Sequence, residues 1–446
     1  KTGILTTLFA KIIPGFPIDW FEGFWAVLFV MTFACTSNHM IFLRNAMRAV
    51  DFQTVEAAQN MGASQFRILT KVVLPVLTPS LLAVTILTFI TGLSATSAPL
   101  LVGGQEFQTI TPMILTFSGN VSSRPLAALL ALFLGVATIL LLTVMIQIEK
   151  RGHYMSISKV KTTIIKQKIR NPILNVLVHI YAYVLFLIYV IPVVLVVLFS
   201  FTDAATIASK KLTLSSFTLD NYISIFQKAT SYKPFVVSIC YSAIAALLVA
   251  VIVLVACRII QKRKDRLGSA LEYGLLIPWL LPTTLMALGL ITTYNTPRFW
   301  MLNQVLTGTS VIMLIGYMII KIPFTLRMTK AAFFALDDSL EDASRNLGAK
   351  PLYTFLRVQL PIILPTVLAI FALNFNGLLG DYDMSVFMYH PLNQPLGVYI
   401  KSLTNSETNA DNAALTFVYA VLMMVISAIV MYLVYGRGNK VDKREK

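Results

Sequence analysis

Charged residues are scarce in this chain of 446 residues. Asp, Glu, Lys and Arg make up 13% of it, against roughly 25% in typical soluble globular proteins. Hydrophobic residues make up 57%. This composition excludes an ordinary soluble domain and predicts an integral membrane protein.

Residues that carry enzyme chemistry are also few. The three cysteines and four histidines have neither the spacing of a metal site nor that of a disulfide framework. No Gly-Lys pair occurs in the sequence, so it lacks the phosphate-binding loop that ends in Gly-Lys-Ser/Thr. The sequence therefore predicts no catalytic residue, no metal site and no cofactor bound by this chain.

Several apolar runs are long enough to cross a bilayer as a helix, which takes about 20 residues. Together they predict an all-α, polytopic membrane protein. The nine runs are 23–43, 80–101, 126–148, 174–200, 236–257, 271–293, 310–328, 362–382 and 413–435.

The net charge of +16 is unevenly distributed along the chain. Five segments hold 27 of the 36 basic residues but only 10 of the 20 acidic ones. Their positions alternate with the nine runs, so the positive-inside rule predicts that all five, with the C-terminus, are cytoplasmic. The charge is thereby explained without nucleic-acid binding. The five segments are 44–79, 149–173, 258–270, 321–361 and 436–446.

One of these cytoplasmic segments occurs twice. Residues 46–82 align with residues 332–368 at an offset of 286, and in both copies 13 residues separate a glycine from the proline of a Leu-Pro pair. Each copy predicts a short helix, a left-handed turn at Gly62 or Gly348, and a second helix that enters the membrane. Each copy would thus form a knob offered to a partner. Identical pairs include Ala57/Ala343, Asn60/Asn346, Gly62/Gly348, Ala63/Ala349, Leu74/Leu360, Pro75/Pro361 and Pro79/Pro365.

The order Glu-Ala-Ala, Gly, Leu-Pro resembles the EAA loop of binding-protein-dependent ABC import permeases. The second copy departs from this pattern with Asp for Glu and Ser for the second Ala. The resemblance implies a type I ABC importer fold, and two copies of a separate cytoplasmic ATPase that uses ATP and Mg and docks on the two loops. The matching residues are Glu56, Ala57, Ala58, Gly62, Leu74 and Pro75 in the first copy, and Asp342, Ala343, Ser344, Gly348, Leu360 and Pro361 in the second.

Two such loops in one chain resemble the fused permeases, in which one polypeptide supplies both halves of the pore. Residues 97–104 and 380–392 resemble the ferric-iron group of this family. The resemblance implies ferric iron as the cargo, with thiamine, polyamines or phosphonates as alternatives. It also implies an extracytoplasmic substrate-binding protein as a partner and a location in the bacterial inner or plasma membrane.

The expected halves are residues 1–150, with the loop at 46–79, and residues 174–446, with the loop at 332–365. A cytoplasmic linker, 151–173, joins them. The first half has about three spans and the second about six, so by analogy we expect three further spans upstream of Lys1.

Polar residues gather near the outer end of the eighth run and in the corresponding segment of the first half. Such residues are costly in lipid and usually face a cavity. In permeases of this type the helix after the EAA loop lines the pathway, and oxygen ligands suit ferric iron. The alternative for the two aspartates is a helix cap or a contact with the binding protein. The predicted pathway residues are Ser94, Thr96, Ser97, Asn374, Asn376, Asp381 and Asp383.

A secondary transporter is the main alternative class, because it also has internal repeats. Such a transporter would carry charged residues near the middle of its spans, which the predicted runs here avoid. A membrane scaffold would explain neither the repeat nor the polar residues. The duplicated loop therefore favours the ABC permease.

Overall fold

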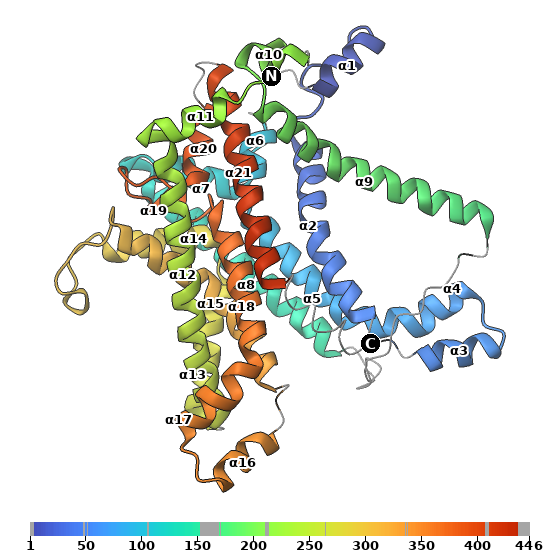
Figure 1. Cartoon of the computed structure of the whole chain (residues 1–446), viewed down its shortest axis with the longest axis vertical. Coiled ribbons are helices and arrows are strands. Elements are labelled where there is room, and N and C mark those ends of the chain that lie inside the picture. The colour runs from blue at the N-terminus through green and yellow to red at the C-terminus, as the bar shows by residue number, and fades with distance from the viewer. Residues whose placement is uncertain are drawn as a thin grey trace. The chain divides into compact units, whose positions relative to one another are not determined.

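The computed structural model describes residues 4–47, 50, 52–104, 107–151, 169, 171–209, 214–263, 265–334, 336, 338–405 and 410–435. Within these ranges the chain is helical, and its only β-type pairings are isolated bridges (Figure 1). Most of the predicted linker 151–173 and the predicted cytoplasmic tail 436–446 lie outside the described residues. The predicted all-α fold is confirmed.

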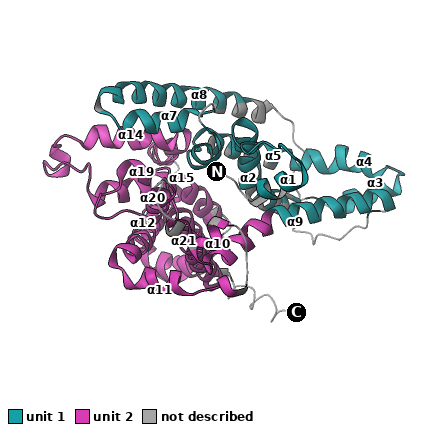
Figure 2. Cartoon of the chain, turned by 90° about the horizontal axis from the view of Figure 1, so that it is seen from above, with its two compact units in different colours: residues 1–188 teal, residues 189–446 magenta. Residues whose placement is uncertain are grey.

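The chain forms two compact units, residues 1–188 and 189–446 (Figure 2). The boundary falls inside the long helix α9 (Pro172–Ser200). Residues 172–188 of α9 thus belong to the first unit, although the sequence suggested that the second half begins at residue 174.

Unit 1 is built around α5, which packs against α2 and α8, while α7 packs on α8. Many apolar side chains of α8 and α9 are exposed, as expected for helices that face lipid. The unit combines these long helices with several short elements. In chain order, the elements before α9 are α1 (Ile4–Ile12), α2 (Phe24–Met47), α3 (Phe52–Asn60), α4 (Gln65–Ile68), the π-helical turn η1 (Leu69–Val73), α5 (Leu74–Leu93), α6 (Ser97–Val102), α7 (Ile110–Ser118), η2 (Val121–Ser123) and α8 (Arg124–Arg151).

Unit 2 is built around α12 (Ala229–Lys262), which packs against α15 (Ser310–Phe334) and α18 (Leu360–Leu379). Small residues on α12, such as Ala245 and Ala246, are fully buried, which lets helices approach closely in a membrane. The other elements are α10 (Ala204–Ser209), η3 (Leu214–Ser216), α11 (Asp220–Gln227), α13 (Arg266–Leu276), η4 (Ile277–Leu280), α14 (Thr283–Tyr294), η5 (Phe299–Met301), α16 (Asp338–Asn346), α17 (Pro351–Thr354), the π-helical turn η6 (Phe355–Gln359), α19 (Ser385–Met388), α20 (Leu396–Asn405) and α21 (Ala410–Tyr435).

Each of the nine predicted runs overlaps helical structure, although the second run, 80–101, is interrupted between the end of α5 at Leu93 and the start of α6 at Ser97. Within the described residues, six helices are long and apolar enough to cross a membrane, or seven if one bent pair counts as a span. In the first two runs the described residues include the apolar stretches Phe24–Thr36 and Val84–Leu93, which lie in α2 with 24 residues and α5 with 20 residues.

The sixth run, 271–293, is not one continuous helix. The chain bends by 107° between Arg266–Leu280 and Thr283–Tyr294. Pro278 and Pro282 lie at this break, and a proline removes a backbone donor and its ring clashes with the preceding turn. The predicted run 271–293 is therefore helical but broken at these prolines.

Lys321 falls where the predicted run 310–328 and the predicted cytoplasmic segment 321–361 overlap. Because α15 continues to Phe334, Lys321 lies in the middle of that helix. Its Nζ lies 2.9 Å from the position that a Cβ atom would occupy at Gly377 of α18. The prediction that charges avoid the span centres is thus wrong, and the distinction from a secondary transporter depends on the duplicated loop.

Candidate functional site

The two copies of the repeat fold alike. Helix α3 corresponds to α16, α4 to α17, η1 to η6 and α5 to α18, and each boundary is shifted by the predicted 286 residues. We call residues 52–73 loop 1 and residues 338–359 loop 2. The predicted order of short helix, turn and second helix is confirmed in both.

The turn of loop 1 depends on Gly62. Its φ is +81°, a left-handed conformation that glycine adopts without steric cost. The Ala63 N–H donates to the Ala58 carbonyl at 3.0 Å, and the Gly62 N–H donates to the Gln59 carbonyl at 2.9 Å. These two bonds form a Schellman motif, which satisfies the last carbonyls of α3.

Loop 2 repeats this turn. The φ of Gly348 is +80°. The Ala349 N–H donates to the Ser344 carbonyl at 3.1 Å, and the Gly348 N–H donates to the Arg345 carbonyl at 2.9 Å. A side chain at Gly348 would meet nothing within 4 Å in this chain. Backbone conformation alone therefore explains this glycine.

The residues predicted to contact a partner do not all share one face. Glu56 and Ala57 of loop 1 are exposed, as are Asp342 and Ala343 of loop 2. Ala58, by contrast, is buried inside its loop. The exposed surface of each short helix thus includes the acidic residue and the alanine that follows it. Of the two membrane-entry prolines, Pro75 is half-buried and Pro361 is exposed.

The interior of loop 1 is apolar. Val55, Ala58 and Ile68 are buried together, and Val72 and Val73 pack against them. Burial of these side chains holds α3 on α4 and η1 through the hydrophobic effect.

The interior of loop 2 is polar at the equivalent positions. Ser344 and Thr354, the counterparts of Ala58 and Ile68, form a buried hydroxyl–hydroxyl hydrogen bond of 2.8 Å. Gln359 Nε2, at the position of Val73, donates to Glu341 Oε2 at 3.0 Å. In this loop hydrogen bonds therefore replace apolar contacts.

Glu341 is also the centre of an ion-pair network with α12. Arg258 donates from Nη1 and Nη2 to its two carboxylate oxygens at 3.1 and 3.3 Å, and Lys262 forms a second ion pair with it. The side chain of Glu341 is 17% exposed. Burial raises the pKa of Glu341, but the hydrogen bonds and charges of Arg258 and Lys262 outweigh burial and lower this pKa to about 2.

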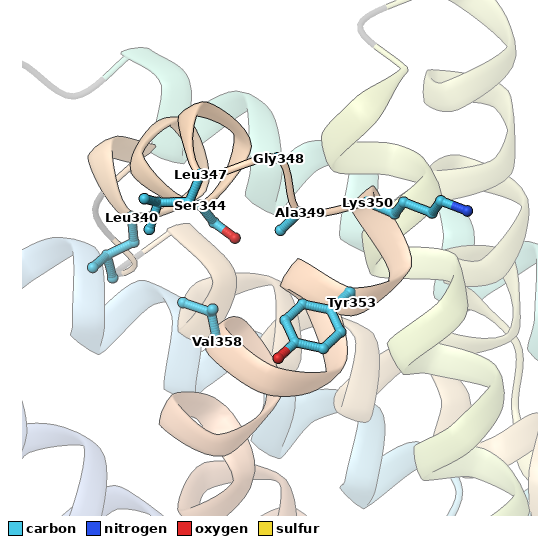
Figure 3. A pocket seen from close by; sticks show the side chains of 8 residues that line it. All are labelled: Leu340, Ser344, Leu347, Gly348, Ala349, Lys350, Tyr353 and Val358. Carbon is cyan, nitrogen blue, oxygen red and sulfur yellow. The ribbon is translucent and has the colours of Figure 1, made fainter.

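A cavity of about 610 Å³ lies beside α16, between this helix and the α17–η6 segment (Figure 3). The backbone turn at Gly348 forms part of its wall. Its lining is mixed apolar and polar, from Leu340, Ser344, Leu347, Gly348, Ala349, Lys350, Tyr353 and Val358.

The predicted pathway residues of unit 2 occupy different environments. Asn374 is buried in α18 and donates from Nδ2 to Thr325 Oγ1 of α15 at 2.7 Å. Asn376 has a buried Oδ1 without a hydrogen-bond partner among the described residues. Helix α18 ends at Leu379, so Asp381 lies beyond the helix instead of inside the predicted run 362–382, and Asp383 lies two residues further on.

Asp381 caps the helix that follows. Its Oδ2 accepts from the Met384 and Ser385 N–H groups at 3.3 and 3.0 Å, and the Ser385 hydroxyl donates to the Asp381 carbonyl at 2.7 Å. This arrangement corresponds to the alternative of a capping role, although the capped helix is α19 and not α18.

The corresponding residues of unit 1 also lie beyond their helix, because α5 ends at Leu93. Thr96 is buried, and its hydroxyl donates to the Ser94 carbonyl at 3.4 Å. Ser97 begins α6. Across the described residues, no group of three His, Cys, Asp or Glu side chains is placed to hold a metal ion.

Glu341 and its partners were not predicted from the sequence. A signal was nevertheless present, because aligning the copies places Glu341 opposite Val55 and Gln359 opposite Val73. Two buried neighbours thus change from apolar to polar together, which indicates a contact between them.

The architecture defines a class of protein: a polytopic helical membrane protein with one exposed loop fold present twice. The chain matches the family described as "Binding-protein-dependent transport system inner membrane component" over residues 3–151 and 169–437. It belongs to this family, and it is a permease subunit of a binding-protein-dependent ABC importer.

Curated relatives agree with this membership. A probable ABC transporter permease protein, y4fN, of Sinorhizobium fredii is 39% identical over 431 residues, which are 96% of this chain and 75% of the relative. The ferric transport system permease protein FbpB of Actinobacillus pleuropneumoniae is 22% identical, over 93% of this chain and 58% of the relative. A putative 2-aminoethylphosphonate permease, PhnV, of Salmonella paratyphi A is 26% identical, over 53% of this chain and 90% of the relative.

One solved structure among those similar to this chain is a bacterial ABC transporter that imports the polysaccharide alginate. The match covers 59% of this chain and 95% of that chain, with 17% identity and a TM-score of 0.48.

Proposed function

We propose that loop 1 and loop 2 are the docking sites of a separate cytoplasmic ATPase, and that this chain moves its substrate inward when the ATPase closes on ATP. Two copies of the ATPase, one for each loop, and a soluble extracytoplasmic binding protein would complete the transporter. The five Lys- and Arg-rich segments and the C-terminus would then be cytoplasmic.

The observation that supports docking is the repetition of one exposed surface. Each loop presents an acidic side chain and an alanine, Glu56 with Ala57 or Asp342 with Ala343, just before a Schellman turn. A short rigid helix with small residues lets another protein approach its backbone closely. The short helix of each loop packs on the second half of the loop, which continues without a break into α5 or α18. A force applied to the short helix would therefore be transmitted to that membrane helix.

For the cargo we propose ferric iron. Two ferric permeases align with this chain over 93% and 86% of its length, whereas the phosphonate permease aligns over 53%. Phosphonates are therefore the second candidate, and thiamine and polyamines follow. The oxygen-bearing side chains of Asn374, Asn376, Asp381 and Asp383, with Ser94, Thr96 and Ser97, stay the proposed pathway residues.

Reconstitution tests both parts of this function. The permease is placed in proteoliposomes with the ATPase that co-purifies with it and the binding protein encoded beside it. Uptake of radiolabelled ferric iron is then compared with uptake of radiolabelled 2-aminoethylphosphonate, with and without ATP. We expect ATP-dependent uptake of iron. Uptake of the phosphonate alone would contradict the cargo, and uptake without ATP would contradict the coupling.

The pathway assignment has its own test. Asp381→Ala with Asp383→Ala should lower iron uptake if these carboxylates line the pathway. Ser385→Ala serves as the matched control, because it removes the hydroxyl contact to the Asp381 carbonyl but keeps both carboxylates. Unchanged uptake and unchanged ATPase stimulation in the aspartate variant would remove Asp381 and Asp383 from the pathway.

A further inference from the structure

The two loops share a backbone fold but are attached to their units by different chemistry. In loop 1, α3 is held by buried apolar side chains. In loop 2, four equivalent positions have become polar, and an ion-pair network reaches from α16 to α12. The four equivalent pairs are Val55/Glu341, Ala58/Ser344, Ile68/Thr354 and Val73/Gln359.

We propose that Glu341 is the positioning residue of loop 2. Its carboxylate fixes α16 to Arg258 and Lys262 at the end of α12 and to Gln359 at the start of α18. Because α12 and α18 also pack against each other, movement of α16 would displace both spanning helices together. Loop 1 has no such ionic link within its own described residues, since its interior contacts are apolar.

The contacts around Glu341 hold its carboxylate in one position, unlike those of a mobile ion pair on the surface. Arg258 binds both carboxylate oxygens in a fork, which restricts direction as well as distance. The same guanidinium lies 5.9 Å from the ring centre of Phe355 in η6, so it is itself held from two sides. Arg345, one turn along α16, adds a weaker contact at 3.6 Å.

Gln359 points to the same role. Its Nε2 donates to Glu341, while its Oε1 is buried without a partner among the described residues. A buried unpaired carbonyl destabilises the fold, and the valine at the equivalent position of loop 1 avoids that cost. We therefore attribute the presence of Gln359 to the hydrogen bond that it donates to the Glu341 carboxylate.

The two kinds of attachment respond differently to salt. The Debye length falls from about 10 Å at 0.1 M to about 3 Å at 1 M, and this screening acts mainly on exposed charges. The salt-sensitive contacts of Glu341 are therefore those with Lys262 and Arg345, whose side chains are 40% and 64% exposed. Apolar contacts are not screened. High salt should thus loosen α16 and leave α3 in place.

Spin labels read this difference directly in the full chain, reconstituted in lipid nanodiscs without any partner. Cys35, Cys240 and Cys257 are replaced by alanine, and one cysteine is introduced by Asn346→Cys or Asn60→Cys. These two asparagines are equivalent, exposed and last in their helices. Raising salt from 0.1 to 1 M should increase the mobile fraction at position 346 by about fivefold and leave position 60 unchanged.

Substitutions separate the ion pair from general loosening. Glu341→Gln should raise the mobile fraction at position 346 at low salt, by about tenfold, since hydrogen bonds to charged groups are the strong ones. Glu272→Gln is the matched control: it breaks the Lys330–Glu272 ion pair, in which Glu272 is 24% exposed, elsewhere in the same unit. It should leave the label at 346 immobile.

An apolar graft gives a second, independent variant. Glu341→Val, Ser344→Ala, Thr354→Ile and Gln359→Val together copy the interior of loop 1 into loop 2. The label at 346 should then stay immobile at both salt concentrations. If the graft does not fold, the salt series on the labelled chain still decides. The proposal would be overturned if the mobile fraction at position 346 changed neither with salt nor with Glu341→Gln. Equal changes at positions 346 and 60 would also overturn it.

The consequence for transport rests on the proposed function and is measured separately. In the reconstituted transporter, Glu341→Gln should lower substrate moved per ATP hydrolysed by about fivefold or more, with an unchanged KM for ATP. A mobile loop 2 with normal transport per ATP would overturn the transmission role of Glu341. Absence of any ATPase docking would contradict the proposed function and leave the spin-label result intact.

Discussion

Replacing Gly348 by alanine should open the turn of loop 2 without any steric clash. A Cβ at this position meets nothing within 4 Å, and φ is +80°, so the effect is one of backbone conformation alone. Holding an L-residue in the left-handed region costs about 1–2 kcal/mol, which corresponds to roughly 5- to 30-fold more frequent opening of the turn. Asparagine tolerates this region better, so Gly348→Asn should have a smaller effect than Gly348→Ala.

Hydrogen exchange measured by mass spectrometry on peptides covering residues 343–350 reports this opening. The Ala349 amide donates to the Ser344 carbonyl. It should lose the most protection in Gly348→Ala and less in Gly348→Asn, compared with the chain that keeps Gly348. Gly274→Ala is the control, because Gly274 also has open space around it but lies inside α13 without a left-handed φ. Alanine there should be neutral or stabilising.

Two results would refute this reasoning. If asparagine opens the turn as much as alanine, conformation is not the reason for the glycine. If Gly274→Ala also exposes the turn at 348, the exchange reports overall loosening of unit 2. Gly62→Ala should reproduce the effect in loop 1, where φ is +81°.

Three further predictions concern single contacts. In a double-mutant cycle, Thr354→Val should destabilise unit 2 by about 1–3 kcal/mol, because it strands the buried Ser344 hydroxyl. Ser344→Ala should cost less, because Thr354 Oγ1 keeps its bond to the Lys350 carbonyl at 3.3 Å, and the double variant should recover most of the Thr354→Val loss in thermal unfolding. Asn374→Leu should cost about 0.5–2 kcal/mol by breaking its bond to Thr325, as in other membrane bundles, and Thr325→Val should cost no more in the Asn374→Leu background. The pKa of Glu341 lies below its usual 4.5, at about 2. Its contribution to the stability of loop 2 should therefore be constant above pH 4.5 and decline as pH falls from there toward 2. The spin label at position 346 would report this loss as an increased mobile fraction at acid pH.

The duplicated loop was predictable because its determinants are local. A glycine with left-handed backbone, a Leu-Pro pair and a fixed spacing of 13 residues specify the turn and the following helix wherever they occur. The positions of the apolar runs were predictable for a similar reason, since length and hydropathy alone determine whether a helix suits the bilayer.

The errors arose where tertiary context decides. Lys321 looked like the first basic residue of a loop, but α15 continues for more than three turns beyond it, and the absence of a side chain at Gly377 makes room for its ammonium. A sequence window cannot identify a neighbour 56 residues away. The break at Pro278 and Pro282 was visible as two prolines, yet membrane helices often tolerate proline, so the 107° bend was not predicted.

Glu341 illustrates a third situation. Considered alone, a glutamate on a polar surface helix indicates a solvated side chain. Its role emerges only when the two copies are compared position by position and the paired change at Gln359 is noticed. Arg258, 83 residues away on another helix, has no counterpart in the repeat and could be found only in the structure.

The central claim is that both loops bind a separate ATPase, and site-specific photo-crosslinking tests it most directly. A photoreactive amino acid is placed at Ala57, at Ala343, or at Leu302 as a control, since Leu302 is 90% exposed and lies on the predicted outer side. On irradiation in membranes, positions 57 and 343 should each give an adduct that contains the ATPase subunit, and position 302 should give none. Adducts at neither 57 nor 343, in membranes that support ATP-dependent uptake, would contradict this account.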